Sequence, residues 1–144
     1  MSEIITIKRF DPGLPLPEYK TPGAAGFDLC AREAVEVPPG ACAKVPLNVA
    51  IALPEGHWAL LAARSSLHKK GLMAANGIGV MDYDYRGDSD EYVCVLYNFT
   101  AETAAVAKGE RIMQAVVLPY AQLPIVEAAS LGQARGGFGT TGTH

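Results

Sequence analysis

Short apolar or alternating runs, each ended by turn residues, make up most of this chain. Alternation and β-branched or aromatic residues favour strands, whereas glycine and proline mark the turns between them. The 15 glycines and 10 prolines among 144 residues exceed the usual share of roughly 12%. Turn signals recurring at this spacing predict an all-β sandwich or barrel with little helix. The expected strands cover residues 4–7, 35–37, 43–53, 58–63, 92–99, 112–118 and 123–128, and the expected helical segment is 66–70, ending at Gly71.

The composition limits the class of protein. With 49% hydrophobic and 19% charged residues, a chain of this length can bury a core of its own, which excludes a disordered protein. A net charge of −3 offers no basic surface for duplex nucleic acid. No apolar run reaches the ~18 residues of a membrane span, and the first residues lack the pattern of a secretion signal. We therefore expect an intracellular, cytoplasmic protein that binds neither nucleic acid nor membrane, with a nuclear location also open.

The last thirteen residues differ from the rest of the chain. Five of the residues 132–144 are glycine and three are threonine, so this segment has too little apolar surface to order itself. One large aromatic residue, Phe138, lies in its middle, which is unusual for a plain linker. We divide the chain into a β core, residues 1–128, and a flexible C-terminal arm, residues 129–144, that folds onto something else.

The segment 77–88 carries the densest chemistry. Glycines stand at both ends of a short apolar run that leads into closely spaced acids and tyrosines. In a continuous strand Asp82 and Asp84 share one face and Tyr83 and Tyr85 the other, unless a turn intervenes. A carboxylate beside a polar pocket can orient a water molecule and take its proton. An exposed acidic hairpin without a function explains these residues equally well.

Arg64, Ser65 and Ser66 follow an apolar run and precede the short helical segment. An arginine fork and two hydroxyls at such a junction favour an anion site, although a serine that caps the helix also explains the pattern. Asp28 and Gln114 are isolated polar residues among apolar neighbours, and Asp28 needs a partner such as Arg64. Taken singly, a half-buried residue of this kind is more often structural than catalytic.

Five segments together resemble the ordered motifs of the trimeric deoxyuridine triphosphatases (dUTPases). They occur in the family's order and at its spacings, and they span nearly the whole chain. The segments are 26–29 (GFDL), 64–67 (RSSL), 79–87 (GVMDYDYRG), 109–114 (GERIMQ) and 136–142 (GGFGTTG).

This resemblance implies a homotrimer of jelly-roll-like β subunits whose active sites draw residues from three chains. It implies hydrolysis of dUTP to dUMP and pyrophosphate with Mg²⁺, by attack of water on the α-phosphorus. That reaction keeps uracil out of DNA and supplies dUMP for thymidylate synthesis. Asp82 matches the carboxylate that activates the water, and Tyr85 matches the aromatic residue that excludes a 2′-hydroxyl. Asn76 matches a uracil-contacting asparagine, and the hairpin that contains Gly79 and Met81 would read the uracil edge through its backbone.

The resemblance also implies which residues bind the phosphates. Arg64 and Ser65 match the phosphate-side pair, and Ser66 replaces the commoner glycine. Gln114 matches a residue of the phosphate and metal-water shell, while Asp28 matches the acid that holds the arginine and the metal-bound waters. The arm residues that would close over the nucleotide are Arg135, Gly137, Phe138, Gly139, Thr140 and Thr141, with Phe138 stacked on the uracil.

Two features depart from the family's pattern. The tail arginine expected five residues before the aromatic residue is Gln133 here, and Arg135 lies three before it. The acidic residues 88–91 directly follow the hairpin, where we expect solvated surface. A dCTP deaminase-type enzyme of the same fold and a catalytically idle binding or regulatory trimer are the alternative interpretations. The deaminase would need a glutamate in the hairpin, and the segment 76–85 has none.

Overall fold

The computed structural model describes residues 3–139, and nearly all of its regular structure is β. Eleven short strands and one 3₁₀ turn, η1, lie in this range. They are β1 (Thr6–Arg9), β2 (Phe27–Cys30), β3 (Val35–Val37), β4 (Cys42–Pro46), β5 (Val49–Ala52), β6 (His57–Ala63), η1 (Leu67–Lys70), β7 (Leu72–Ala74), β8 (Gly79–Met81), β9 (Val93–Asn98), β10 (Ala104–Val106) and β11 (Arg111–Pro119).

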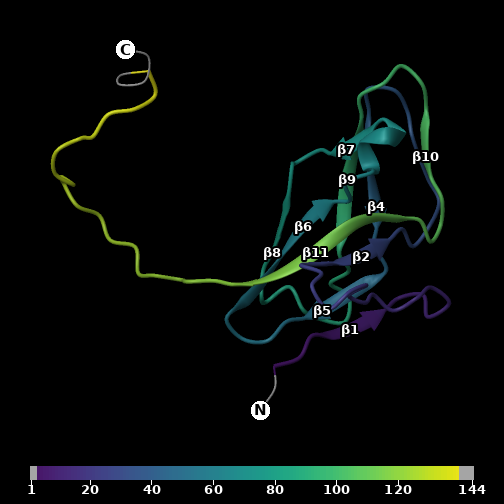
Figure 1. The fold of residues 1–144 in the computed structure, drawn as a ribbon, viewed down its shortest axis with the longest axis horizontal. Coiled ribbons are helices and arrows are strands. Elements are labelled where there is room, and N and C mark those ends of the chain that lie inside the picture. Colours follow the sequence, from purple (N-terminus) through teal and green to yellow (C-terminus); the bar gives the residue numbers. More distant parts are fainter. Residues whose placement is uncertain (1–2, 140–144) are drawn as a thin grey trace.

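Four antiparallel sheets share one core. The largest has the strand order β2-β11-β6-β8, and a second has the order β4-β9-β7. Two strand pairs, β1-β5 and β10-β3, complete the body. Figure 1 shows β11 running across the body before the chain leaves it as a long arm. The prediction of an all-β fold with little helix is confirmed, although the sheets do not close into a barrel.

Alternation along the strands explains how the core forms. In β9 every second residue is buried, including Cys94 and Leu96, and in β6 Ala59 and Leu61 are buried in the same way. Each fully buried side chain of leucine size contributes about 1.5–3 kcal/mol, so sheets with one apolar face are stable only when they pack together. The largest fully buried side chains include Tyr92, Leu29, Leu47, Ile51, Leu53, Leu61, Leu72, Leu96, Ile112 and Met113.

The segment 43–53 forms two strands, β4 and β5, so the prediction of one continuous strand is wrong. Asn48 lies between them in the left-handed conformation, with φ 73°, which interrupts a strand and which asparagine tolerates better than most residues. Its buried side-chain oxygen accepts the Asp11 N–H at 2.6 Å, and its amide donates to the Asp11 carbonyl at 3.1 Å. The break directs β4 into one sheet and β5 into another.

The predicted strand 123–128 is absent. β11 ends at Pro119, and residues 120–139 are extended without regular structure. Leu123, Ile125 and Val126 are 75, 98 and 85% exposed. A strand needs hydrogen bonds from a neighbouring strand, and residues 123–128 pair with none in the part of the chain that is described.

Smaller details of the sequence prediction also differ from the structure. The first strand begins at Thr6, two residues later than expected. The predicted helical segment is the single turn η1, which ends as expected at Gly71 with φ 80°. All three cysteines are free, and burial raises the pKa of Cys94 to about 12. Residues 3–139 contain no helix with the length and hydrophobicity that a membrane crossing requires.

Candidate active site

The central strands bring Asp28, Gln114 and Arg64 together. Gln114 on β11 lies opposite Asp28 on β2, and Arg64 follows the end of β6 on the other side of β11. Arg64 Nε lies 3.1 Å from Asp28 Oδ2, as the sequence led us to expect, and Arg64 Nη1 donates to the Arg111 carbonyl at 3.2 Å. The Gln114 amide donates to the Ala63 carbonyl at 3.2 Å. These contacts fix a cationic fork and an amide at the end of the sheet, and we call Asp28, Arg64 and Gln114 the phosphate-side group.

The two serines lie next to this group. Ser65 and Ser66 form the turn that leads into η1, and both are exposed. Ser66 occupies the capping position of η1 but makes no capping hydrogen bond through its side chain. A hollow of about 500 Å³ lies beside Ser66 and Arg64, with Lys70 and Arg111 on its wall. The Ser66 hydroxyl is therefore placed for a ligand at an opening whose wall carries three cationic side chains and one acid, Glu110, which pairs with Lys70 at 2.9 Å.

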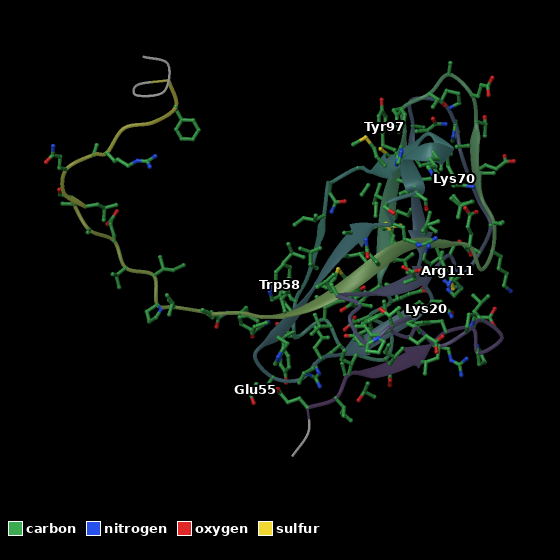
Figure 2. All side chains as sticks on the ribbon, viewed as in Figure 1. Lys20, Glu55, Trp58, Lys70, Tyr97 and Arg111 are labelled. Carbon is green, nitrogen blue, oxygen red and sulfur yellow. The ribbon has the colours of Figure 1, made fainter. Side chains whose placement is uncertain are left out.

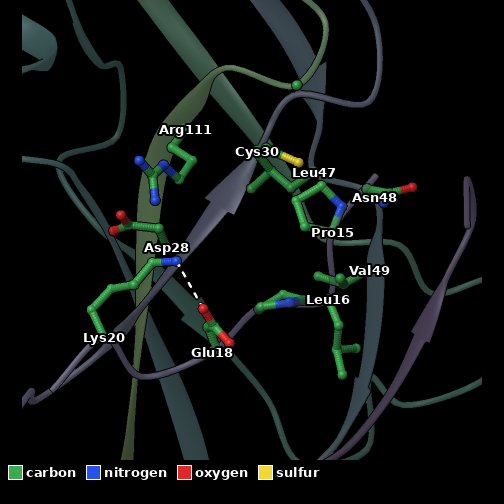
Figure 3. A pocket seen from close by; sticks show the side chains of 12 residues that line it. Pro15, Leu16, Glu18, Lys20, Asp28, Cys30, Leu47, Asn48, Val49 and Arg111 are labelled. Atoms are coloured by element: carbon green, nitrogen blue, oxygen red, sulfur yellow. Dashed lines mark hydrogen bonds and ion pairs between the residues drawn. The ribbon is translucent and has the colours of Figure 1, made fainter. Parts of the chain in front are cut away.

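Asp28 and Arg111 also border a second hollow, of about 410 Å³, on the same side of the sheet (Figure 3). Its rim includes the exposed ion pair between Lys20 and Glu18, at 3.0 Å. Its floor is apolar, with Leu47 among the lining residues. The guanidinium of Arg111 makes no hydrogen bond or ion pair with any of residues 3–139.

The acidic hairpin turns immediately after β8. The Tyr85 N–H donates to the Asp82 carbonyl at 3.2 Å, so a turn intervenes where the sequence left open a continuous strand. Asp82 is exposed, and with Trp58, Tyr83 and Tyr120 it lines a cleft of about 670 Å³. A carboxylate at the edge of such a cleft can activate water, whereas a buried one paired with a cation would be less available.

Two glycines, one in the turn before β8 and one at its first residue, occupy positions that disfavour larger residues. A Cβ on Gly79 would lie 3.0 Å from the Leu61 Cβ, so a larger residue would push β8 away from β6. Gly77 has φ 78°, a conformation that favours glycine. The Asn76 amide donates to the Ile78 carbonyl at 2.7 Å, which closes the turn and leaves its exposed oxygen without a partner among the described residues. Met81 is half-buried at the end of β8.

Tyr85 is anchored rather than free. Its hydroxyl donates to the Glu91 carbonyl at 2.7 Å, and burial, with Asp90 and Glu91 adding to the effect, raises the pKa of this phenol. The interpretation of residues 88–91 as solvated surface holds for Asp88, whose side chain is fully exposed, but is wrong for Glu91. The Glu91 side chain is only 12% exposed and forms an ion pair with Arg32 at 2.7 Å. No local sequence pattern marks this pair, because its members are 59 residues apart.

The phosphate-side group and Asp82 lie at opposite ends of β6. Ala59 on β6 pairs with Met81, so Asp82 falls next to Trp58, whereas Arg64 follows the other end of the same strand. Arg64 lies six positions beyond Trp58, which at ~3.3 Å per position is about 20 Å. Figure 2 shows Trp58 and Arg111 correspondingly far apart on the body. One copy of the chain does not bring the two groups together.

The arm residues lie away from both groups (Figure 2). Phe138 is fully exposed, and Arg135 donates to the neighbouring Gly136 carbonyl at 3.2 Å. Gly137 and Gly139 have the positive φ angles that the glycine-rich pattern indicates. Thr140 and Thr141 lie outside the described residues.

Known proteins are similar to this chain over nearly its whole length. The family model described as dUTPase matches residues 13–142. The deoxyuridine 5′-triphosphate nucleotidohydrolase of Anaeromyxobacter sp. (strain Fw109-5) is 44% identical over 135 residues, 91% of this chain and 90% of that protein. A dUTPase from Streptococcus mutans has a crystal structure with a TM-score of 0.74 and 31% identity, over 82% of this chain and 98% of that one. The phage 80α dUTPase, 22% identical, has the same jelly-roll-like fold, with a TM-score of 0.85 over 98% of this chain and 100% of that one.

Proposed function

The chain belongs to the dUTPase family, and we propose that it hydrolyses dUTP to dUMP and pyrophosphate in active sites shared between copies of the chain. A water oxygen attacks the α-phosphorus, and the bond from that phosphorus to the bridging oxygen of the departing pyrophosphate breaks. Asp82 is the general base that takes the water proton. Its exposed carboxylate at the edge of the cleft with Trp58 and Tyr120 supports this role.

The hairpin before Asp82 selects the base. A uracil ring placed against residues 76–81 meets backbone N–H and C=O groups, and the Asn76 side-chain oxygen is available to it. Cytosine presents the wrong donors and acceptors to such a surface and leaves buried polar groups unpaired. The tight hairpin leaves no room for the thymine methyl, which it excludes sterically. Tyr85 then packs against the deoxyribose, where a 2′-hydroxyl would collide with its ring.

The phosphate-side group receives the triphosphate. Arg64 offers a guanidinium fork already oriented by Asp28, and Ser65 and Ser66 supply hydroxyls as negative charge grows on the leaving oxygen. Gln114 adds an amide at the same end of the sheet.

The donor set fits Mg²⁺ bound with the nucleotide. Among residues 3–139 no three His, Cys, Asp or Glu side chains gather into a dedicated site, and Mg²⁺ prefers phosphate oxygens and retained waters to such a cage. Asp28 is the carboxylate that contacts the metal through water. When bound, Mg²⁺ neutralises part of the triphosphate charge.

We propose a homotrimer in which each site takes Asp82 from one chain and the phosphate-side group from another. The observation that carries this proposal is the separation of about 20 Å along β6, estimated at ~3.3 Å per residue, which is too far for one chain to serve one α-phosphorus with both groups. Residues 129–144 form the arm that closes over the nucleotide, with Phe138 on the uracil and Arg135, Gly137 and Gly139 near the phosphates. Thr140 and Thr141 complete that closure.

Pyrophosphate release from dUTP, dTTP, dCTP and UTP, each with and without Mg²⁺, tests this function. We expect release from dUTP with Mg²⁺ and little from the other three. Ammonia release from dCTP would indicate the deaminase instead. Nucleotide binding without any product would indicate the idle trimer.

A further inference from the structure

The Tyr85 ring is held in two ways. Its hydroxyl donates to the Glu91 carbonyl at 2.7 Å, and its ring packs against Tyr92, with centroids 6.2 Å apart and planes inclined by 32°. Tyr92 is fully buried, and its hydroxyl has no hydrogen-bond partner among residues 3–139, so it supports Tyr85 through its ring. Tyr85 itself is 37% exposed. The contacts leave part of the Tyr85 ring accessible and hold its hydroxyl against the Glu91 carbonyl.

Glu91 is fixed by its carboxylate. Oε2 accepts from Arg32 Nε at 2.7 Å, and Oε1 accepts from Arg32 Nη2 at 3.1 Å. Oε2 also accepts the Asn48 N–H at 2.9 Å. A bidentate pair of this kind has both strength and a defined geometry, and here one partner is nearly buried. The carbonyl that binds Tyr85 therefore belongs to a residue with little freedom to move.

The supports of this ion pair are themselves part of the body. The Arg32 N–H donates to the Pro46 carbonyl at 2.8 Å, and the Tyr92 N–H donates to the Val49 carbonyl at 2.7 Å. Asn48, buried between β4 and β5, connects the same region to Asp11. The position of the Tyr85 ring thus depends on three separate stretches of backbone.

We propose that the Arg32–Glu91 ion pair is a positioning device that sets the sugar selectivity of the active site through Tyr85. Neither Arg32 nor Glu91 touches the nucleotide; they act by holding the Glu91 carbonyl that receives the Tyr85 hydroxyl. The proposal rests on the proposed function, in which the Tyr85 ring excludes a 2′-hydroxyl. Rejection of one added hydroxyl depends on how closely the ring is held, and a misplacement of about 1 Å can change rates by up to 10²-fold.

The decisive experiment measures two ratios of kcat/KM and the kcat for dUTP in the full-length protein. We expect Glu91→Gln to raise the ratio of kcat/KM for UTP to that for dUTP about tenfold, because a loosened ring admits the 2′-hydroxyl. The ratio for dTTP to dUTP should stay unchanged, since the base is read by residues 76–81. The kcat for dUTP should stay within about threefold of the original, because Asp82 is not disturbed.

Asp88→Asn is the matched control. It removes the same charge from the same loop, but its side chain is fully exposed and does not contact Arg32. All three values should equal those of the unmodified protein. Arg32→Lys is the second test, because it keeps the charge while losing the fork, and it should raise the UTP ratio less than Glu91→Gln does. Combining Glu91→Gln with Arg32→Lys should raise the UTP ratio little beyond the larger single effect, as expected for one interaction.

Thermal unfolding establishes that each variant is folded before its rates are compared. An unchanged UTP ratio in folded Glu91→Gln or Arg32→Lys overturns the proposal. A UTP ratio and a dTTP ratio that rise together also overturn it, because that result indicates general loosening. If the unmodified protein fails to hydrolyse dUTP, the proposed function fails instead, and the two failures are thereby distinguished.

Discussion

Mixing two inactive variants should restore activity if each active site is shared between chains. We choose Asp82→Asn, which removes the base, and Arg64→Gln, which removes the guanidinium from the other end of β6. Each variant alone should lose turnover by roughly 10²–10⁴-fold, the usual contribution of a positioned base or of charge stabilisation at the leaving group. Arg64 is about one-third exposed and Gln can still bond to Asp28, so the substitution should leave the fold intact.

The size of the recovered activity depends on whether the Asp82 and Arg64 of one site come from different chains or from the same chain. In a symmetric trimer formed at random from equal amounts of the two variants, half the chains keep Asp82 and half keep Arg64. When the two residues come from different chains these chances multiply, so about a quarter of all sites should be complete. When both come from the same chain, no site is complete, because no chain carries both. The two arrangements therefore predict activities that differ by at least tenfold over the background of the variants.

The assay is pyrophosphate release from dUTP by trimers that carry two affinity tags, one on each variant. Coexpression followed by purification on both tags isolates trimers with at least one chain of each kind, and removing the inactive homotrimers raises the expected share of complete sites from about a quarter to about a third. Size-exclusion chromatography with light scattering verifies their mass. Mixed trimers as inactive as their parents would refute the reasoning from the β6 register.

Three further results are expected. Deletion of residues 129–144 should leave a folded body, judged by circular dichroism. The dUTP turnover should fall by at least about tenfold, because closing segments exclude water and position the reacting groups. Full activity would contradict the arm's role. Tyr85→Ala should raise turnover of UTP relative to dUTP, measured as a ratio of kcat/KM, and should leave the dTTP ratio unchanged. Iodoacetamide at pH 8 should modify the exposed Cys42 but not Cys94, whose pKa of about 12 keeps it as a thiol, and mass spectrometry before and after unfolding in urea checks this.

The sequence predicted best what depends on local pattern. The apolar run 58–63 and the β-prone run 92–99 located β6 and β9 to within one residue at each end, because apolar, β-branched and aromatic residues favour buried strands. The pairing of Arg64 with Asp28 also followed from a simple cause, since an acid among apolar neighbours needs a cation. The motif segments of the body that carry the other predicted site residues lie on strands and on the turns between them.

What the sequence did not predict depends on contacts between distant segments. Glu91 was expected on the solvated surface with the other acids of residues 88–91, and only the fold brings it against Arg32. Asn48 looked like one more residue in a long strand, and its left-handed conformation is stabilised by Asp11, far away in the chain. Such residues have no local signature, because a single ion pair or hydrogen bond leaves no periodic pattern.

The incorrect strand at 123–128 has a different cause, and it bears on how the active site is assembled. Leu123, Ile125 and Val126 have the apolar bulk of a strand, but they pair with no strand among the described residues and are at least 75% exposed. Burying three such side chains is worth about 5 kcal/mol by the usual area relation, so an exposed run of this kind favours a surface on another copy of the chain. The trimer we propose supplies one. The same segment leads directly to Phe138, so packing these residues on a neighbour would carry the arm toward an active site that is not its own.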